Sequence, residues 1–195
     1  MKTKLTTLLI GIVILISSCN QKVTYEARDI NFDRDVCYVC LMGLTDQRYN
    51  AQSINEFGEV HWYDDIGCLA EEMKDTETWN TWKGNKVKFW IGDASKENDP
   101  SNWIDAEKAF FDYGKHTPMG YGYSAYAQKP DSEAIYTFEE TLTRINEGKT
   151  MRENFIQEKM LMMKDNPKKM KMLKNKLERE QSKRDASSHE GHNHH

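Results

Sequence analysis

The chain has 195 residues, of which 38% are hydrophobic and 11% aromatic, enough for one compact domain or two small ones. These proportions exclude a fully disordered chain. The formal net charge of −4 hides an uneven distribution, because residues 20–148 carry 13 basic and 24 acidic side chains, whereas residues 149–185 carry 12 basic and 6 acidic ones. The acidic body lacks the clustered Lys and Arg that phosphate contacts require, which argues against a nucleic-acid-binding core.

The first residues are typical of a secretion signal. Lys2 and Lys4 precede an apolar run over residues 8–16, which is too short to span a bilayer comfortably but suits the central region of a signal peptide. The run ends in Ile16-Ser17-Ser18-Cys19, which resembles the bacterial lipobox. We therefore expect residues 1–18 to be a lipoprotein signal peptide.

Cys19 is the expected lipidation site. As the first residue of the mature protein it would lose its thiol to a thioether, and acyl chains rather than a helix would anchor the chain. Residues 19–31 then form the anchor and tether, and Asn20 favours the outer membrane, with the protein facing the periplasm. An ordinary signal peptide followed by an unmodified cysteine is the alternative.

Alternating and aromatic-rich runs begin the folded body. Residues 48–54 and 59–63 predict two strands joined by a tight turn, and residues 86–91 predict a third strand. Before the third strand, Asp64 or Asp65 is placed to cap a helix. The apolar stripe of this helix, at i, i+3, i+4 and i+7, consists of Ile66, Leu69, Ala70 and Met73.

A similar order recurs further along the chain. Residues 103–111 and 122–127 are strand candidates, and a helix capped near Ser132 follows them and ends at Gly148. The apolar face of this helix consists of Ile135, Phe138, Leu142 and Ile145. The repeated order indicates an α+β protein with two similar halves.

Residues 149–185 differ from the body in composition. They contain no Trp or Tyr, many Lys, and six of the chain's ten methionines. Asn166 followed by Pro167 is typical of a helix cap and first position, which predicts two short helices or one broken helix. Residues 186–195 form a His-rich tail that cannot pack a core and whose imidazoles suit copper, nickel or zinc, with a purification tag as the alternative.

Three further cysteines, Cys37, Cys40 and Cys68, lie in the body. Cys37 and Cys40 have the spacing of a redox or zinc half-site, but the lack of a matching second half-site disfavours a closed zinc centre. Met42 follows Cys40 by two positions, and such a soft sulfur pair selects Cu(I) over zinc. Met119 lies in a glycine-rich turn where we expect an exposed side chain. Gap-filling in an apolar core is the alternative for both methionines.

Four short motifs occur in unbroken order between residues 36 and 146. They are Cys40-Leu41-Met42-Gly43, Trp62-Tyr63-Asp64-Asp65, Trp103-Ile104-Asp105-Ala106 and Pro118-Met119-Gly120-Tyr121-Gly122. Together they resemble the NosL family of copper-binding lipoproteins. The resemblance implies an α+β fold, a tandem of two small ββαβ units at about residues 32–94 and 101–148. The composition of residues 149–185 adds a helical C-terminal extension to this domain.

The same resemblance implies a function and partners. It implies a lipid-anchored Cu(I) chaperone, not an enzyme, that delivers copper to nitrous oxide reductase for its multicopper centre. The chaperone would work beside an accessory periplasmic protein and an ABC transporter.

Site residues follow from the resemblance as well. The family's Cys-x-Met pair falls on Cys40 and Met42, and its Met-Gly site falls on Met119. Where the family usually has glycine between the first two ligands, this chain has Leu41. Cys37 is common in related sequences and is a further candidate, either as a ligand or as a partner that traps Cys40 in a disulfide.

Two histidines are candidates to complete the donor set. His116 lies just before Pro118 and Met119, and His61 lies in a predicted strand, where a structural role is the alternative. A second store of metal is expected in the extension and tail, with thioethers for Cu(I) at Met160, Met162, Met163, Met170 and Met172, and imidazoles for Cu(II) at His189, His192, His194 and His195. The alternative is that the basic helices dock on a partner or on anionic lipid.

Three other functions are alternatives to the chaperone. A general copper-sequestering lipoprotein of the cell envelope, not tied to denitrification, would use the same site. A thiol redox protein would use Cys37 and Cys40 and would be indifferent to copper. An enzyme could pair Cys68 with His61, but nothing in the sequence indicates a substrate pocket, so we expect no enzymatic activity.

Overall fold

The computed structural model describes residues 23–162 and 166–190. Its centre is an antiparallel four-stranded sheet in the order β2-β1-β3-β4. The strands are β1 (Ala51–Asn55), β2 (Val60–Tyr63), β3 (Val87–Gly92) and β4 (Trp103–Asp105). The first three match the strands predicted from the alternating runs, and every residue of the inner strand β1 is buried.

Asn55 fixes the turn between β1 and β2. Its side-chain oxygen accepts hydrogen bonds from the backbone N–H groups of Phe57 (3.0 Å) and Glu59 (2.9 Å). The hairpin places Ala51 opposite Tyr63, so the connection from β2 to the first helix begins beside the start of β1.

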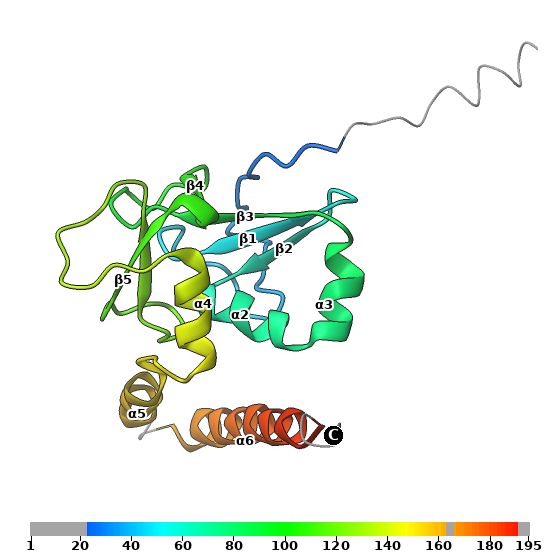
Figure 1. The fold of residues 1–195 in the computed structure, drawn as a ribbon. Coiled ribbons are helices and arrows are strands. Elements are labelled where there is room, and N and C mark those ends of the chain that lie inside the picture. The colour runs from blue at the N-terminus through cyan, green and yellow to red at the C-terminus, as the bar shows by residue number, and fades with distance from the viewer. Residues whose placement is uncertain (1–22, 163–165, 191–195) are drawn as a thin grey trace, which may run out of the picture.

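Two capped helices lie on one side of this sheet (Figure 1). α2 (Ile66–Lys74) begins after Asp65 and α3 (Thr76–Lys83) begins after Asp75, and each carboxylate accepts a backbone N–H of the first turn. The helix predicted from the apolar stripe is therefore present as α2, and α3 goes beyond the predicted elements. Three members of the predicted stripe are buried, namely Ile66, Leu69 and Ala70.

The second half departs from the predicted order. The expected strand over residues 103–111 divides, because the Asp105 carboxylate caps a short 3₁₀ turn (Ala106–Lys108) before β5 (Phe110–Tyr113). β4 pairs with β3 and joins the first sheet, whereas β5 pairs with β6 (Tyr123–Tyr126) in a second sheet of two strands. The structure is a mixed α and β fold with two sheets, and the tandem of two ββαβ units is not confirmed.

α4 (Phe138–Asn146) closes the second half. It begins after Thr137 rather than near Ser132, because Thr137 and Glu140 form a capping box in which each side chain accepts a backbone N–H of the other. It ends just before Gly148, as predicted, and this glycine has a φ of 78°. Within the described ranges no strand follows α4.

The C-terminal extension forms α5 (Arg152–Met162) and α6 (Pro167–Glu190). Asn166 caps α6 as predicted, because its side-chain oxygen accepts the Lys169 N–H at 3.2 Å. Figure 1 shows α6 running below the domain, away from α5. Among the helices of the described chain, none is long and apolar enough to cross a bilayer.

Candidate metal centre

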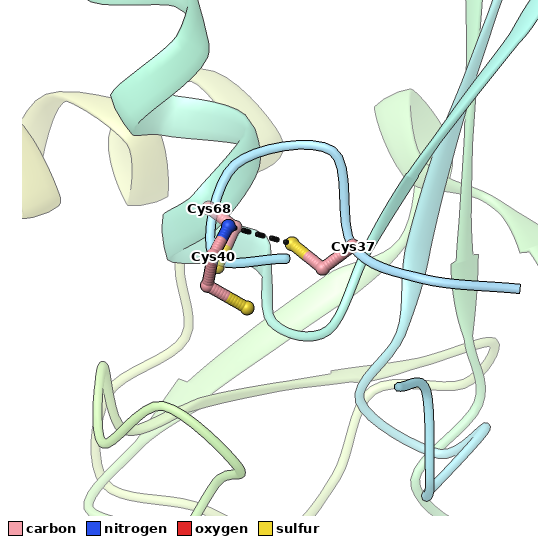
Figure 2. A group of neighbouring side chains, drawn as sticks. All are labelled: Cys37, Cys40 and Cys68. Carbon is pink, nitrogen blue, oxygen red and sulfur yellow. Dashed lines mark hydrogen bonds between the residues drawn. The ribbon is translucent and has the colours of Figure 1, made fainter. Parts of the chain in front are cut away.

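Three cysteine side chains converge where the loop before β1 meets the start of α2 (Figure 2). The sulfur atoms of Cys37, Cys40 and Cys68 all lie within 4.8 Å of one another. Cys37 and Cys68 are buried, with 0% and 2% of their surfaces exposed, whereas Cys40 is half-buried. Two donors are therefore shielded from solvent, and the third is accessible.

A tight turn brings the first two thiols together. The Cys37 N–H donates to the Met42 carbonyl (2.8 Å), and the Leu41 N–H donates to the Cys37 carbonyl (3.0 Å). The turn holds Leu41 at a φ of 60°, which favours glycine and costs an L-residue about 1 to 2 kcal/mol. Because the Leu41 side chain is 74% exposed, this strain belongs to the backbone. The glycine usual in the NosL family at this position suits the same conformation.

The third thiol is placed by the first turn of α2. The Asp65 side chain accepts the Gly67 N–H (3.1 Å), and its backbone carbonyl accepts the Cys68 N–H (2.8 Å). The other carboxylate oxygen of Asp65 accepts hydrogen bonds from the Thr117 hydroxyl and the Met119 N–H (3.3 Å). One buried carboxylate, whose pKa burial raises, thus joins the helix of Cys68 to the turn of Met119.

The three thiols hold their protons unequally. Hydrogen bonds with the Cys40 and Cys68 side chains lower the pKa of the Cys37 thiol far below its ordinary value, and the Cys40 N–H lies 3.4 Å from the Cys37 sulfur. The same bonds raise the pKa of Cys40 and, together with burial, that of Cys68. Of the three thiols, Cys37 therefore loses its proton most readily. Burial first, and then the Cys37 charge, raise the pKa of Asp64 to about 7.

This donor set fits a soft metal ion. Two thiolates on one ion, at about 2.3 Å each, lie at most about 4.6 Å apart. The observed sulfur separations therefore need only small side-chain rotations to close on an ion. A structural zinc site needs a fourth ligand, and no other Cys, His or carboxylate of the described residues joins the group. Three thiolates without that fourth ligand suit copper better.

The burial of Cys37 argues against a thiol-disulfide oxidoreductase. Its thiol is the most acidic of the three, but its surface is fully covered. Attack on the disulfide of another protein requires an accessible thiolate. The more accessible thiol is that of Cys40, which is half-buried and whose pKa is raised.

The two candidate methionine ligands both contact the core that contains the buried cysteines. Met42 is half-buried and packs against the hydrophobic core that contains Cys37 and Cys68. Met119 is only 5% exposed and belongs to the same core, so the expectation of an exposed side chain is wrong. The buried Asp65 carboxylate accepts the Met119 N–H and so holds this turn against the core. The role of these thioethers as ligands stays a prediction.

His61 lies apart from the sulfur atoms. Its Nδ1 is 2.8 Å from the Glu72 carboxylate, and its ring is stacked between those of Tyr38 (3.7 Å) and Trp82 (3.8 Å). Tyr38 belongs to the turn between Cys37 and Cys40. The structure therefore gives His61 a structural role, in which its ring supports the turn between Cys37 and Cys40.

His116 is exposed and lines a cleft of about 480 Å³ beside the cysteine loop. Met42 and Asp64 line the same cleft, and Thr117 and Pro118 continue its wall. Two of the sequence-predicted candidates, His116 and Met42, thus face one space. The ligand role of His116 stays a prediction.

Cys68 is the member of the cluster that the sequence did not indicate as a ligand. It is far along the chain from the Cys37-x-x-Cys40 pair and belongs to no motif of paired cysteines. The usable signal was the predicted cap at Asp65, which places Cys68 in the first turn of α2. A third thiol in an oxidising compartment was a second signal, because unpaired thiols are rare there.

The remaining candidates lie in the extension and at the two ends. Met160 in α5 and Met170 in α6 are half-buried. His189 falls within α6, but its side chain is not among those described. The candidates outside the described residues are Cys19, Met163, His192, His194 and His195.

No protein-family model matches the sequence, and no curated protein matches it. Among solved structures, the chain is similar to the crystal structure of the copper chaperone NosL from Shewanella denitrificans, with 19% sequence identity and a TM-score of 0.49. The match covers 60% of this chain and 96% of that chain. That protein bears the name of the family that the sequence motifs resemble, while the case for metal binding by this chain rests on its own three cysteines.

Proposed function

We propose that this chain is a copper chaperone that binds Cu(I) through the thiolates of Cys37, Cys40 and Cys68. One observation carries the proposal: three sulfur atoms from two separate elements, a loop and a helix, lie within 4.8 Å of one another. Thiolates select Cu(I). The half-buried Met42 and the buried Met119 lie in the same core and offer thioethers, which need no deprotonation.

Cys40 supplies the route for release. It is half-buried, whereas Cys37 and Cys68 are covered, so a ligand from a partner can approach the ion from the side of Cys40. Copper then leaves by associative exchange, in which the new donor binds before the Cys40 thiolate is released. The buried thiols protect the ion until that contact forms.

Loading the site requires deprotonation. The pKa values of Cys40 and Cys68 are raised, and the protons of these thiols leave to solvent when the sulfurs bind the ion. A three-thiolate site therefore binds copper more weakly as the pH falls.

The proposed setting is the cell envelope. The signal-like start and the lipobox-like sequence at Cys19 support a lipid-anchored protein that faces the periplasm, on the outer membrane. The motifs that resemble the NosL family support delivery of Cu(I) to nitrous oxide reductase, with its accessory periplasmic protein and ABC transporter as partners.

Copper sequestration unconnected with denitrification is the second candidate. The full burial of Cys37 and Cys68 favours it, because covered ligands exchange slowly. The two functions differ in transfer. A chaperone passes Cu(I) to apo nitrous oxide reductase faster than to a small chelator of equal affinity, whereas a sequestering protein shows no such preference.

Competition for Cu(I) tests the proposal. The reduced mature chain, residues 19–195 with Cys19→Ala, is titrated with Cu(I) under anaerobic conditions against a strong chelator. We expect one tight equivalent, lost in Cys68→Ser and weakened in Met42→Leu. Met73→Leu is the matched control, since Met73 is also half-buried against the core. Copper that stays with the chelator, or full binding by Cys68→Ser, contradicts the proposal.

A further inference from the structure

α5 is docked on the domain at the turn that carries Met119. Arg152 donates a hydrogen bond from Nη1 to the Met119 carbonyl (3.0 Å), and its guanidinium lies 5.0 Å from the centre of the Tyr121 ring. Phe155 packs directly on Gly120, where an added Cβ would lie 2.5 Å from the Phe155 side chain. The extension therefore holds a defined position beside the candidate metal centre.

One face of α5 forms a wall of the cleft next to the cysteine loop. This face, spaced i, i+3, i+4 and i+7, consists of Phe155, Glu158, Lys159 and Met162. The other side of the cleft includes Met42, Asp64 and His116. The positive charge of Lys159 acts on Asp64 and opposes the rise in its pKa, which agrees with the two side chains facing one space.

Three donors suited to Cu(I) line this cleft: Met42, His116 and Met162. Met162 is 84% exposed and His116 is exposed, so both meet solvent ions directly. Met42 is half-buried and also packs against the core that contains Cys37. The hydrogen bond from the Cys37 N–H to the Met42 carbonyl ties these two residues together. Met42 thus contacts both the cleft and the surroundings of the thiols.

We propose that Met42, His116 and Met162 form a second, outer Cu(I) site, from which the ion passes to the three thiols. The proposal rests on the proposed function and deepens it, because it assigns the loading route of that site. In the transfer, the bonds from copper to Met162 and His116 break as bonds to the cysteine sulfurs form. The thiol protons leave to water, and copper remains Cu(I) throughout. Neutral donors hold the ion less tightly than thiolates, so transfer runs inward.

Methionine methyl signals test this site residue by residue. The reduced mature chain with Cys19→Ala, labelled at its methionine methyl groups, is titrated with Ag(I), a redox-inert substitute for Cu(I). We expect the first equivalent to shift the signal of Met42, and Ag(I) beyond the first equivalent to shift the signal of Met162. The signal of Met172, which is 73% exposed on α6 and does not line the cleft, stays in place at the same ratio.

Variants at exposed positions give the matched comparison. We expect the double variant His116→Ala and Met162→Leu to lose one bound equivalent of Ag(I) and to load the thiols more slowly, with the tight equivalent unchanged. Met172→Leu keeps both equivalents. A Met162 signal that does not move, or an equal loss in Met172→Leu, overturns the outer site.

The two proposals fail in different ways. A Cys40 thiol that stays as reactive toward an alkylating reagent after the first equivalent as before it shows that the cysteine site is wrong. The Met162 signal reports on the outer site independently of that result. If the thiols stay reactive and the Met162 signal shifts, the outer site binds metal. Its role in loading the three thiols is then overturned.

Discussion

The two halves of the domain supply the candidate site in different ways. Residues 32–94 hold all three thiols, on a loop and a capped helix attached to the four-stranded sheet. Residues 101–148 hold no member of the thiol group and contribute the neutral candidate Met119, from a turn beside the two-stranded sheet. Asp65 joins the two halves at this point, because its carboxylate binds both the start of α2 and the Met119 turn.

The difference indicates a division of roles. On the proposed function, the thiols of the first half determine how tightly copper binds, because they are anionic ligands in a buried and hydrogen-bonded arrangement. On the same proposal, Met119 of the second half adds a neutral thioether beside the thiols, with a smaller effect on affinity. This division predicts a clear order of effects when single groups are removed.

Loss of a thiol gives the largest expected effect. We expect Cys68→Ser to weaken Cu(I) binding by on the order of 100-fold or more, because a buried thiolate is lost from the donor set. Met119→Leu, in the second half, is expected to weaken binding by about 10-fold or less. Anaerobic competition against a chelator measures both. Equal losses of Cu(I) affinity in the two variants would contradict the proposed difference between the two halves.

Loss of the joining carboxylate is next. We expect Asp65→Ala to lower the free energy of unfolding by about 2 to 3 kcal/mol, since it removes a helix cap and leaves buried donors without their acceptor. Asp75→Ala is the matched control. Asp75 caps α3 at an exposed position, so its loss costs about 1 kcal/mol. Urea unfolding measures both, and a similar cost for the two caps would count against the joining role of Asp65.

Asp64 predicts a pH dependence. Because its pKa is about 7 in the folded chain against an ordinary 3.8, folding favours its protonated form. The stability that the protonated Asp64 carboxyl contributes is fully present below pH 4 and is lost as the pH rises through about 7. We therefore expect the difference in the free energy of unfolding between Asp64→Asn and wild type to grow in favour of the variant by about 2 kcal/mol from pH 5 to pH 7. Above pH 8 this difference stays nearly constant. A difference between the two proteins that stays constant in urea unfolding from pH 5 to pH 8 would exclude this account.

The smallest expected effect concerns Leu41, in the turn from Cys37 to Met42. Leu41→Gly relieves a backbone strain of about 1 kcal/mol or more, but glycine also gains freedom in the unfolded chain, so we expect a net stabilisation of about 0.5 kcal/mol. Leu41→Ala keeps the strained φ and is expected to give no gain. Thermal unfolding of the apo protein measures both variants. An equal gain in Leu41→Ala would assign the effect to the side chain instead.

Much of the first half could be predicted because its signals are local. The alternating runs around the Asn55 turn predict β1 and β2, and the cap at Asp65 with its apolar stripe predicts α2. The pair Cys37 and Cys40 was visible as a sulfur motif. Its third member, Cys68, was not, because only the folding of α2 against the loop brings that thiol within 4.8 Å of the other two.

The errors in the second half have a common physical cause. Met119 belongs to the buried core, and its turn is bonded by Asp65, more than fifty residues earlier, and contacted by Arg152 and Phe155, more than thirty residues later, with no sequence pattern that links them to it. β4 contains only Trp103–Asp105, too few residues for alternation to reveal its partner, and it pairs with β3 of the first half. Long-range packing, rather than local propensity, decided both outcomes.

X-ray absorption at the copper edge tests the central claim most directly. The sample is the reduced mature chain with Cys19→Ala, loaded with one equivalent of Cu(I), beside the same chain with Cys68→Ser. Binding by the cysteine cluster predicts sulfur neighbours alone around copper, with fewer of them in Cys68→Ser. Nitrogen or oxygen neighbours in place of sulfur, or a spectrum unchanged by Cys68→Ser, would contradict the assignment of the three thiols as the copper site.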